Sequence, residues 1–192
     1  MTAVEPAKTR SAGPQVWPLS VQAYHALGEM GLIPEKTELL YGQIFHKTPK
    51  SPLHRLLAMR LAEWLRRVLP SGFHLQQEQP LTCAESEPEP DLSVIRGSIE
   101  DYAAEHPRTA ELVIEVCVTG QEYDRSKLRA YAGAGVKEVW LVLAPEKQVE
   151  VHHLPSADQF RERIVHGPGG QLASTVLPQF KVDLDTLFAS GA

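Results

Sequence analysis

The hydrophobic pattern of the first 50 residues predicts a helix followed by a hairpin. Residues 1–16 are small, polar and proline-bearing, which is typical of a disordered tail. Ser20 has the character of an N-cap, and the helix that it begins should end near Met30, before a glycine and a proline. Two short apolar runs follow within residues 37–48, and Tyr41–Gly42 between them predicts a turn.

A long amphipathic helix comes next. Ser51 followed by Pro52 is a strong start signal, because proline suits the first helical position, and the helix should end before Pro70. Apolar residues recur at helical spacing and predict its buried face: Leu53, Leu57, Leu61, Trp64 and Val68, widened by Leu56 and Leu65.

Beyond this helix the pattern predicts a mixed sheet. The expected strands cover residues 73–79, 91–95, 112–118, 139–143, 149–154 and 161–165, with a last strand and a short helix near 183–189. Only the step from 112–118 to 139–143 contains a helix, capped by Asp124 and closed by Gly135, so this pair should be parallel. The acidic, proline-rich segment 83–90 should be a solvated loop. We therefore expect an α/β sandwich around a mixed β-sheet.

Composition adds bounds on the class of protein. A chain of 192 residues suits one domain, which we expect to span residues 17–192. A net charge of −5 counts against a general nucleic-acid coat protein but leaves a local basic groove open. No apolar run approaches the roughly 20 residues of a membrane helix, the N-terminus lacks a secretory h-region, and the two cysteines are too few for a disulfide framework. A cytoplasmic protein is expected.

Glu115 is the residue that does not fit its surroundings. It lies within the apolar run 112–118, where burial of an ionised carboxylate costs several kcal/mol unless a partner compensates it. Strand alternation puts Val113, Glu115 and Cys117 on one face, and Asp91 at the start of the 91–95 strand can approach Glu115. Two adjacent carboxylates favour a shared cation, and oxygen ligands favour Mg²⁺ or Mn²⁺. The alternatives are a turn role for Asp91 and a solvent-reaching edge position for Glu115.

A metal-assisted phosphodiester hydrolase also needs a cation near the reacting oxygens. Cys117, two residues after Glu115, cannot supply a positive charge. Lys127, expected on the first turn of the next helix, could reach back over Glu115 with its four-carbon side chain. The alternative is an exposed helix lysine.

Three segments, "EPEPDLSVI", "ELVIEVCV" and "YDRSKLRAYAGAGVKEVWLV", resemble the Uma-type family of putative restriction endonucleases, within the PD-(D/E)xK nuclease superfamily. The resemblance runs from about residue 20 to 187 and implies the restriction-endonuclease-like fold. By position, Pro90–Asp91 resembles the superfamily's PD and Glu115 its acidic residue. Cys117 stands where most members place lysine, a departure that the Uma-type group shares, and the resemblance implies that Lys127 substitutes for it.

The resemblance adds three further candidates. Glu38 matches the family's early acidic position, as a further metal or water contact, although a surface carboxylate of the hairpin is the alternative. His54 matches the histidine of the first core helix, where it could bind a phosphate or only pack. Glu78, in the strand before Asp91, is a weaker candidate for the site.

Two hypotheses follow. The first is a Mg²⁺-dependent (or Mn²⁺-dependent) endonuclease acting on DNA, with Asp91 and Glu115 holding the metal and Lys127 steadying the nucleophilic water. The second is a non-catalytic dimeric nucleic-acid-binding or interaction module of the same fold. The resemblance also suggests a homodimer. A zinc site is disfavoured, because His152 and His153 are adjacent in a strand and face opposite ways.

Overall fold

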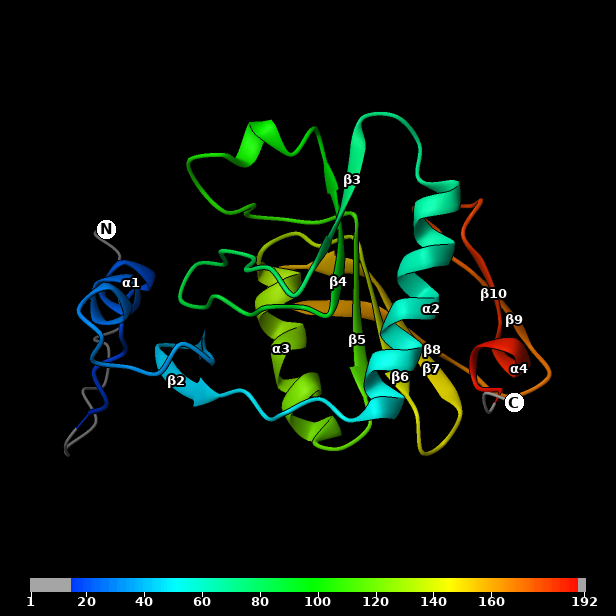
Figure 1. Cartoon of the computed structure of the whole chain (residues 1–192), viewed down its shortest axis with the longest axis horizontal. Helices are drawn as coiled ribbons and strands as arrows, with labels where there is room; N and C mark the ends of the chain where they lie inside the picture. The colour runs from blue at the N-terminus through cyan, green and yellow to red at the C-terminus, as the bar shows by residue number, and fades with distance from the viewer. Residues whose placement is uncertain (1–14, 190–192) are drawn as a thin grey trace, which may run out of the picture.

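A six-stranded sheet forms the centre of the computed structural model, which describes residues 15–189 (Figure 1). Its strands follow chain order, β3-β4-β5-β6-β7-β8, and only β5 and β6 are parallel, as the single helical crossover predicts. The strands are β3 (Phe73–Gln77), β4 (Leu92–Arg96), β5 (Leu112–Cys117), β6 (Glu138–Leu143), β7 (Gln148–Ser156) and β8 (Gln159–His166). Most of the tail expected over residues 1–16 lies outside the described residues.

The long helix α2 (Pro52–Val68) covers one face of the sheet, and Ser51 caps it by accepting a hydrogen bond from the His54 N–H at 3.2 Å. The predicted buried face is partly wrong, because Leu53 and Leu56 are exposed (45% and 36%). The buried side chains are His54, Leu57, Ala58, Leu61, Ala62 and Leu65. Two alanines therefore take core positions, and their small size suits a close approach to the sheet.

Helix α3 (Gln121–Gly133) packs on the opposite face and connects β5 to β6 (Figure 1). The prediction that Asp124 caps this helix is wrong. Gly120 is the N-cap with a left-handed φ of 74°, which glycine adopts without strain, so the helix begins four residues earlier than expected. Lys127 consequently lies on the second turn. The expected left-handed glycine after the helix is confirmed at Gly135 (φ 73°).

A hairpin stands beside the sheet, formed by β1 (Thr37–Leu40) and β2 (Gln43–His46). Its turn lies at Tyr41–Gly42 as predicted, with left-handed φ values of 52° and 73°. Helix α1 (Val21–Glu29) precedes it and begins at the predicted cap, Ser20. The expectation that segment 83–90 is solvated is wrong, because the N–H of the buried Glu87 donates to the Leu39 carbonyl at 2.7 Å. This segment adds a partner to β1.

The C-terminal residues close the apolar layer on the α2 side. The expected last strand is a small two-stranded sheet of β9 (Gln171–Ala173) and β10 (Lys181–Asp183), followed by the short helix α4 (Leu184–Leu187). Phe180 stacks on Trp140 of β6, with ring centroids 5.1 Å apart. The remaining short element is the 3₁₀ turn η1 (Glu100–Tyr102). No helix within residues 15–189 is long and apolar enough to cross a membrane.

Candidate active site

Glu115 lies in the middle of β5 and is buried, with 3% of its surface exposed. The strand's alternation places it on the same face as Val113 and Cys117, as predicted from the sequence, and this face is the α3 side, while Leu112, Ile114 and Val116 face the α2 layer. Three groups contact its carboxyl. Tyr131 O–H donates to Oε1 at 2.6 Å, Lys127 Nζ lies 3.3 Å from the same oxygen, and the Asp91 N–H donates to Oε2 at 3.3 Å.

This environment makes Glu115 hard to ionise. Burial is the largest influence and raises its pKa to about 7, against the opposing effect of the Lys127 ammonium. The nearby charges of Asp91, Asp124 and Glu38 raise it further. A single lysine is thus not enough to neutralise the carboxylates gathered at this point, and the site favours an additional positive charge or a proton.

Asp91 immediately precedes β4, which pairs with β5 in the antiparallel register that sets Leu92 opposite Ile114. Its Oδ2 accepts hydrogen bonds from the Val116 N–H at 2.7 Å and from His54 Nε2 at 3.0 Å. Its Oδ1 accepts one from Lys50 Nζ at 2.7 Å. Burial opposes ionisation, but the hydrogen bonds and charges of His54 and Lys50 outweigh it and lower the pKa of Asp91 to about 2. The pKa of Asp91 is therefore lowered while that of the neighbouring Glu115 is raised, so Asp91 ionises far more readily than Glu115.

Lys127 points from the second turn of α3 into this cluster and is 4% exposed. Its Nζ lies 3.2 Å from Glu38 Oε1, 3.3 Å from Glu115 Oε1 and 3.9 Å from Asp124 Oδ1. Burial would lower its pKa, but the three carboxylates outweigh that effect and raise it. The ammonium is fixed among these oxygens and remains charged at any working pH.

Glu38 is buried on β1 and joins the site, so the alternative of a surface carboxylate is wrong. Tyr123 O–H donates to its Oε1 at 2.8 Å, and the Glu89 N–H donates to its Oε2 at 3.1 Å. Segment 83–90 and helix α3 together enclose this carboxylate, through Glu89 on one side and Tyr123 and Lys127 on the other. The hairpin therefore contributes a third acidic group to the environment of Lys127.

The two weaker candidates occupy different places. His54 is buried beside Asp91, and its second ring nitrogen, Nδ1, has no hydrogen-bond partner among the described residues. Glu78 follows β3 in a left-handed conformation (φ 52°), and its side chain is 55% exposed. It contacts Lys50 Nζ at 2.9 Å and does not reach the other carboxylates through any direct contact among the described residues. Glu78 thus belongs to the edge of the site.

Sequence reasoning missed Lys50, Tyr123, Asp124 and Tyr131. A signal existed for Tyr131, which is four residues after Lys127 and so shares its helix face. No such periodicity pointed to Lys50, which lies outside regular structure between β2 and α2. Its place at the site depends on how this connecting segment folds across the sheet.

The cluster opens into a cavity of about 290 Å³ lined by Glu38, Asp91, Glu115 and Lys127 together with residues 45–51 and 118–120. Asp91 and Glu115 are the residues that could hold a divalent cation there. Within residues 15–189, no group of three or more His, Cys, Asp or Glu side chains is arranged as a metal site. Two carboxylate ligands fit a hard ion such as Mg²⁺, which keeps several of its waters, better than they fit zinc.

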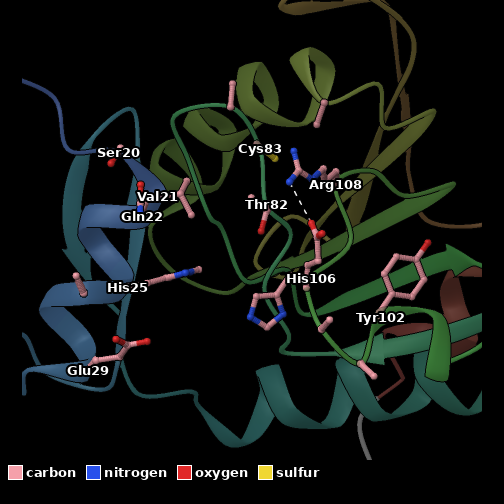
Figure 2. Close-up of a pocket in the computed structure, with 16 residues that line it drawn as sticks. Ser20, Val21, Gln22, His25, Glu29, Thr82, Cys83, Tyr102, His106 and Arg108 are labelled. Carbon is pink, nitrogen blue, oxygen red and sulfur yellow. Dashed lines mark hydrogen bonds and ion pairs between the residues drawn. The ribbon is translucent and has the colours of Figure 1, made fainter.

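A larger depression, of about 1320 Å³, lies between α1 and the loop that follows η1 (Figure 2). His25 and His106 face each other across it, with ring centroids 6.4 Å apart. Arg108 and Glu105 form an ion pair on its rim, but both are largely exposed. This groove lacks the convergence of buried charges found at Glu115, so size alone does not make it the reactive site.

Comparison with known proteins finds a family and a solved structure that this chain resembles. A family model named Uma2, described as "Putative restriction endonuclease", matches residues 22–185. A crystal structure from Anabaena variabilis, titled as a putative nuclease belonging to DUF820, superposes with a TM-score of 0.71 at 19% identity, covering 84% of this chain and 96% of that one. At that identity the likeness concerns the fold. No curated protein matches the chain.

Proposed function

Because the chain belongs to the Uma2 family, whose model covers residues 22–185, we propose that it is a metal-dependent endonuclease that hydrolyses DNA phosphodiester bonds. The family assignment confirms the resemblance drawn from the sequence, and the structural likeness confirms the restriction-endonuclease-like fold. What we propose beyond the family and the fold is the metal requirement, the substrate and the roles of the residues.

One observation carries it: the acidic side chains of Glu38, Asp91, Glu115 and Asp124 line one cavity, and Glu38, Asp91 and Glu115 among them are buried. A structural ion pair would need only one carboxylate for each cation. Here Glu38, Glu115 and Asp124 share Lys127 within 3.9 Å, which is an excess of negative charge away from water. Excess buried carboxylate is typical of a site that takes up an additional cation.

The proposed roles follow from position. Asp91 Oδ1 and the Glu115 carboxylate face one cavity and would hold Mg²⁺ or Mn²⁺, which lowers the pKa of a bound water and stabilises charge on a phosphate. Lys127 supplies a fixed positive charge beside the nucleophilic water or the developing oxyanion. Cys117 cannot take this role, because a thiol is neutral, or negative when ionised, and supplies no positive charge. His54 orients Asp91 by its hydrogen bond.

The test is supercoiled-plasmid nicking with Mn²⁺, comparing the wild type with Asp91→Asn and Glu115→Gln. We expect both variants to lose nicking, and Glu63→Gln to retain it, since Glu63 is an exposed carboxylate on α2 outside the cavity. Nicking that persists in Asp91→Asn and Glu115→Gln would contradict the assignment of these ligands.

A second candidate, a non-catalytic nucleic-acid-binding or interaction module, is favoured by a different observation. Lys50 and His54 already contact Asp91, and Lys127 already contacts Glu115, so each carboxylate has a cationic or polar partner without any metal. Absence of nicking at high enzyme concentration, combined with a melting temperature insensitive to Mn²⁺, would support this module over the enzyme. The homodimer that the resemblance suggests stays a prediction for both candidates.

A further inference from the structure

The two oxygens of Asp91 are occupied in different ways. Oδ2 accepts two hydrogen bonds from fixed donors, the Val116 backbone N–H at 2.7 Å and His54 Nε2 at 3.0 Å. Among the described residues, Oδ1 has one partner, Lys50 Nζ, at 2.7 Å. A cation that binds Asp91 therefore has room at Oδ1, at the place where the Lys50 ammonium lies.

Lys50 differs from Lys127 in how firmly it is held. Lys127 lies on a helix, is 5% exposed in its side chain and contacts three carboxylates. Lys50 lies in the irregular segment between β2 and α2, and its side chain is 28% exposed. A side chain with these properties can leave Asp91 without opening the core.

Glu78 provides a second contact that keeps Lys50 at the cavity edge. Its carboxylate lies 2.9 Å from Lys50 Nζ and is 55% exposed. Glu78 adopts a φ of 52°, which is uncommon for a residue other than glycine. Its backbone N–H donates to the carbonyls of Pro90 and Asp91, each at 3.2 Å. The backbone of Glu78 is thus fixed to the segment that carries Asp91, which keeps its carboxylate within reach of Lys50.

We propose that Lys50 is a displaceable counter-ion of Asp91: it occupies Oδ1 in the metal-free protein, and after leaving Oδ1 it binds the phosphate of the entering nucleic acid. This inference rests on the proposed function. Two cations cannot share Oδ1 without strong repulsion, so Lys50 moves when a divalent ion binds. Glu78 retains the ammonium beside the cavity that Lys50 and Glu115 both line, within reach of a phosphodiester bound there.

The first measurement uses no nucleic acid. Mn²⁺ is titrated calorimetrically into the wild type, Lys50→Met and Lys47→Met. Lys47 is the matched control, because it lies in the same segment and cavity wall but pairs with Glu89 in place of Asp91. We expect Lys50→Met to bind Mn²⁺ about tenfold more tightly, the size of one charge-assisted hydrogen bond removed from competition. Lys47→Met should bind as the wild type does.

The second measurement follows plasmid nicking in Mn²⁺ at several salt concentrations. Loss of a phosphate contact should raise the KM of Lys50→Met and reduce the slope of log affinity against log salt by about one. Lys47→Met again serves as the reference for loss of one charge.

The outcomes separate this inference from the proposed function. Binding of Mn²⁺ by the wild type with no tightening in Lys50→Met overturns the role of Lys50 alone. Tighter Mn²⁺ binding with KM and salt dependence equal to those of Lys47→Met overturns the phosphate contact. Failure of both wild type and Lys50→Met to bind Mn²⁺ overturns the inference and the metal site together.

Discussion

Replacing Glu115 by glutamine should remove most of the pH dependence of stability between pH 5 and pH 8 in the metal-free protein. The carboxyl pKa is raised from 4.5 to about 7 by burial, so the folded state binds this proton more tightly than the unfolded chain. The resulting stabilisation is complete below pH 4.5 and is lost as the pH rises through about 7. A pKa difference of one unit corresponds to about 1.36 kcal/mol, so the rise from 4.5 to about 7 corresponds to about 3 kcal/mol of stability in total.

Asp124, at the same site, also has its pKa raised by burial, so the difference between the profiles of wild type and Glu115→Gln, and not the wild-type profile alone, reports Glu115. Asp91 has its pKa lowered to about 2, so its contribution is lost only as the pH falls below 3.8, and Lys127 stays charged throughout. Glutamine keeps the shape of the side chain, and its carbonyl oxygen can still accept from Tyr131 and Lys127. It loses the titration, and the Asp91 N–H loses its acceptor at Oε2 if the amide nitrogen takes that place.

The assay is urea unfolding in EDTA at pH 5, 6, 7 and 8 for the wild type, Glu115→Gln and Glu63→Gln. We expect the free energy of unfolding of the wild type and of Glu63→Gln to fall by about 2.5 kcal/mol more than that of Glu115→Gln across the series, because part of the stabilisation is already lost at pH 5. Parallel pH profiles for wild type and Glu115→Gln would refute the argument, because they would show that Glu115 does not take up a proton in the folded protein.

Three further predictions concern the metal, the lysine and the hairpin. Millimolar Mn²⁺ should raise the wild-type melting temperature by several degrees, since a ligand at 100 times its Kd contributes about 2.7 kcal/mol. In a thermal-shift experiment the melting temperature of Glu115→Gln should not respond to Mn²⁺, and an unresponsive wild type would count against the site. Lys127→Met should keep Mn²⁺ binding but nick plasmid about 10²- to 10³-fold more slowly, with partial recovery on adding Cys117→Lys; equal rates in wild type and Lys127→Met would exclude the helix lysine from the reaction. Gly42→Ala should lower the free energy of unfolding by more than about 1 kcal/mol, because the residue has φ 73° and a Cβ there would lie 2.3 Å from Pro18 Cβ and 2.8 Å from the Leu19 nitrogen; urea unfolding that matches the wild type would contradict this.

Local patterns were sufficient for the parts of the site carried by regular structure. The alternation of β5 placed Glu115 on the face opposite Ile114, and the helix after that strand placed Lys127 within reach of it. The parallel pairing of β5 and β6 also followed from one helical crossover. These features depend on residues close in sequence, so periodicity determines them.

The predictions that were wrong concern features that depend on contacts between distant segments or on the conformation of one loop residue. Glu38 is buried where segment 83–90 and helix α3 pack against β1, and no local pattern encodes these contacts. Leu53 and Leu56 belong to an apolar stripe of α2, but the sheet packs against the alanine-containing side of the helix. Asp124 has the chemistry of an N-cap, yet Gly120 can adopt the left-handed conformation that ends the preceding loop, so the helix starts there.

The agreement between strand order and chain order has a consequence for synthesis on the ribosome. Each strand from β3 to β8 pairs with its neighbour in sequence, so the sheet can grow as the chain emerges, with few long loops to close. The exception is the α2-side layer, which β9, β10 and α4 complete at the very end of the chain. Until Phe180 is released from the ribosomal tunnel, Trp140 lacks its stacking partner, and a nascent or truncated chain presents that apolar surface to chaperones and to other chains.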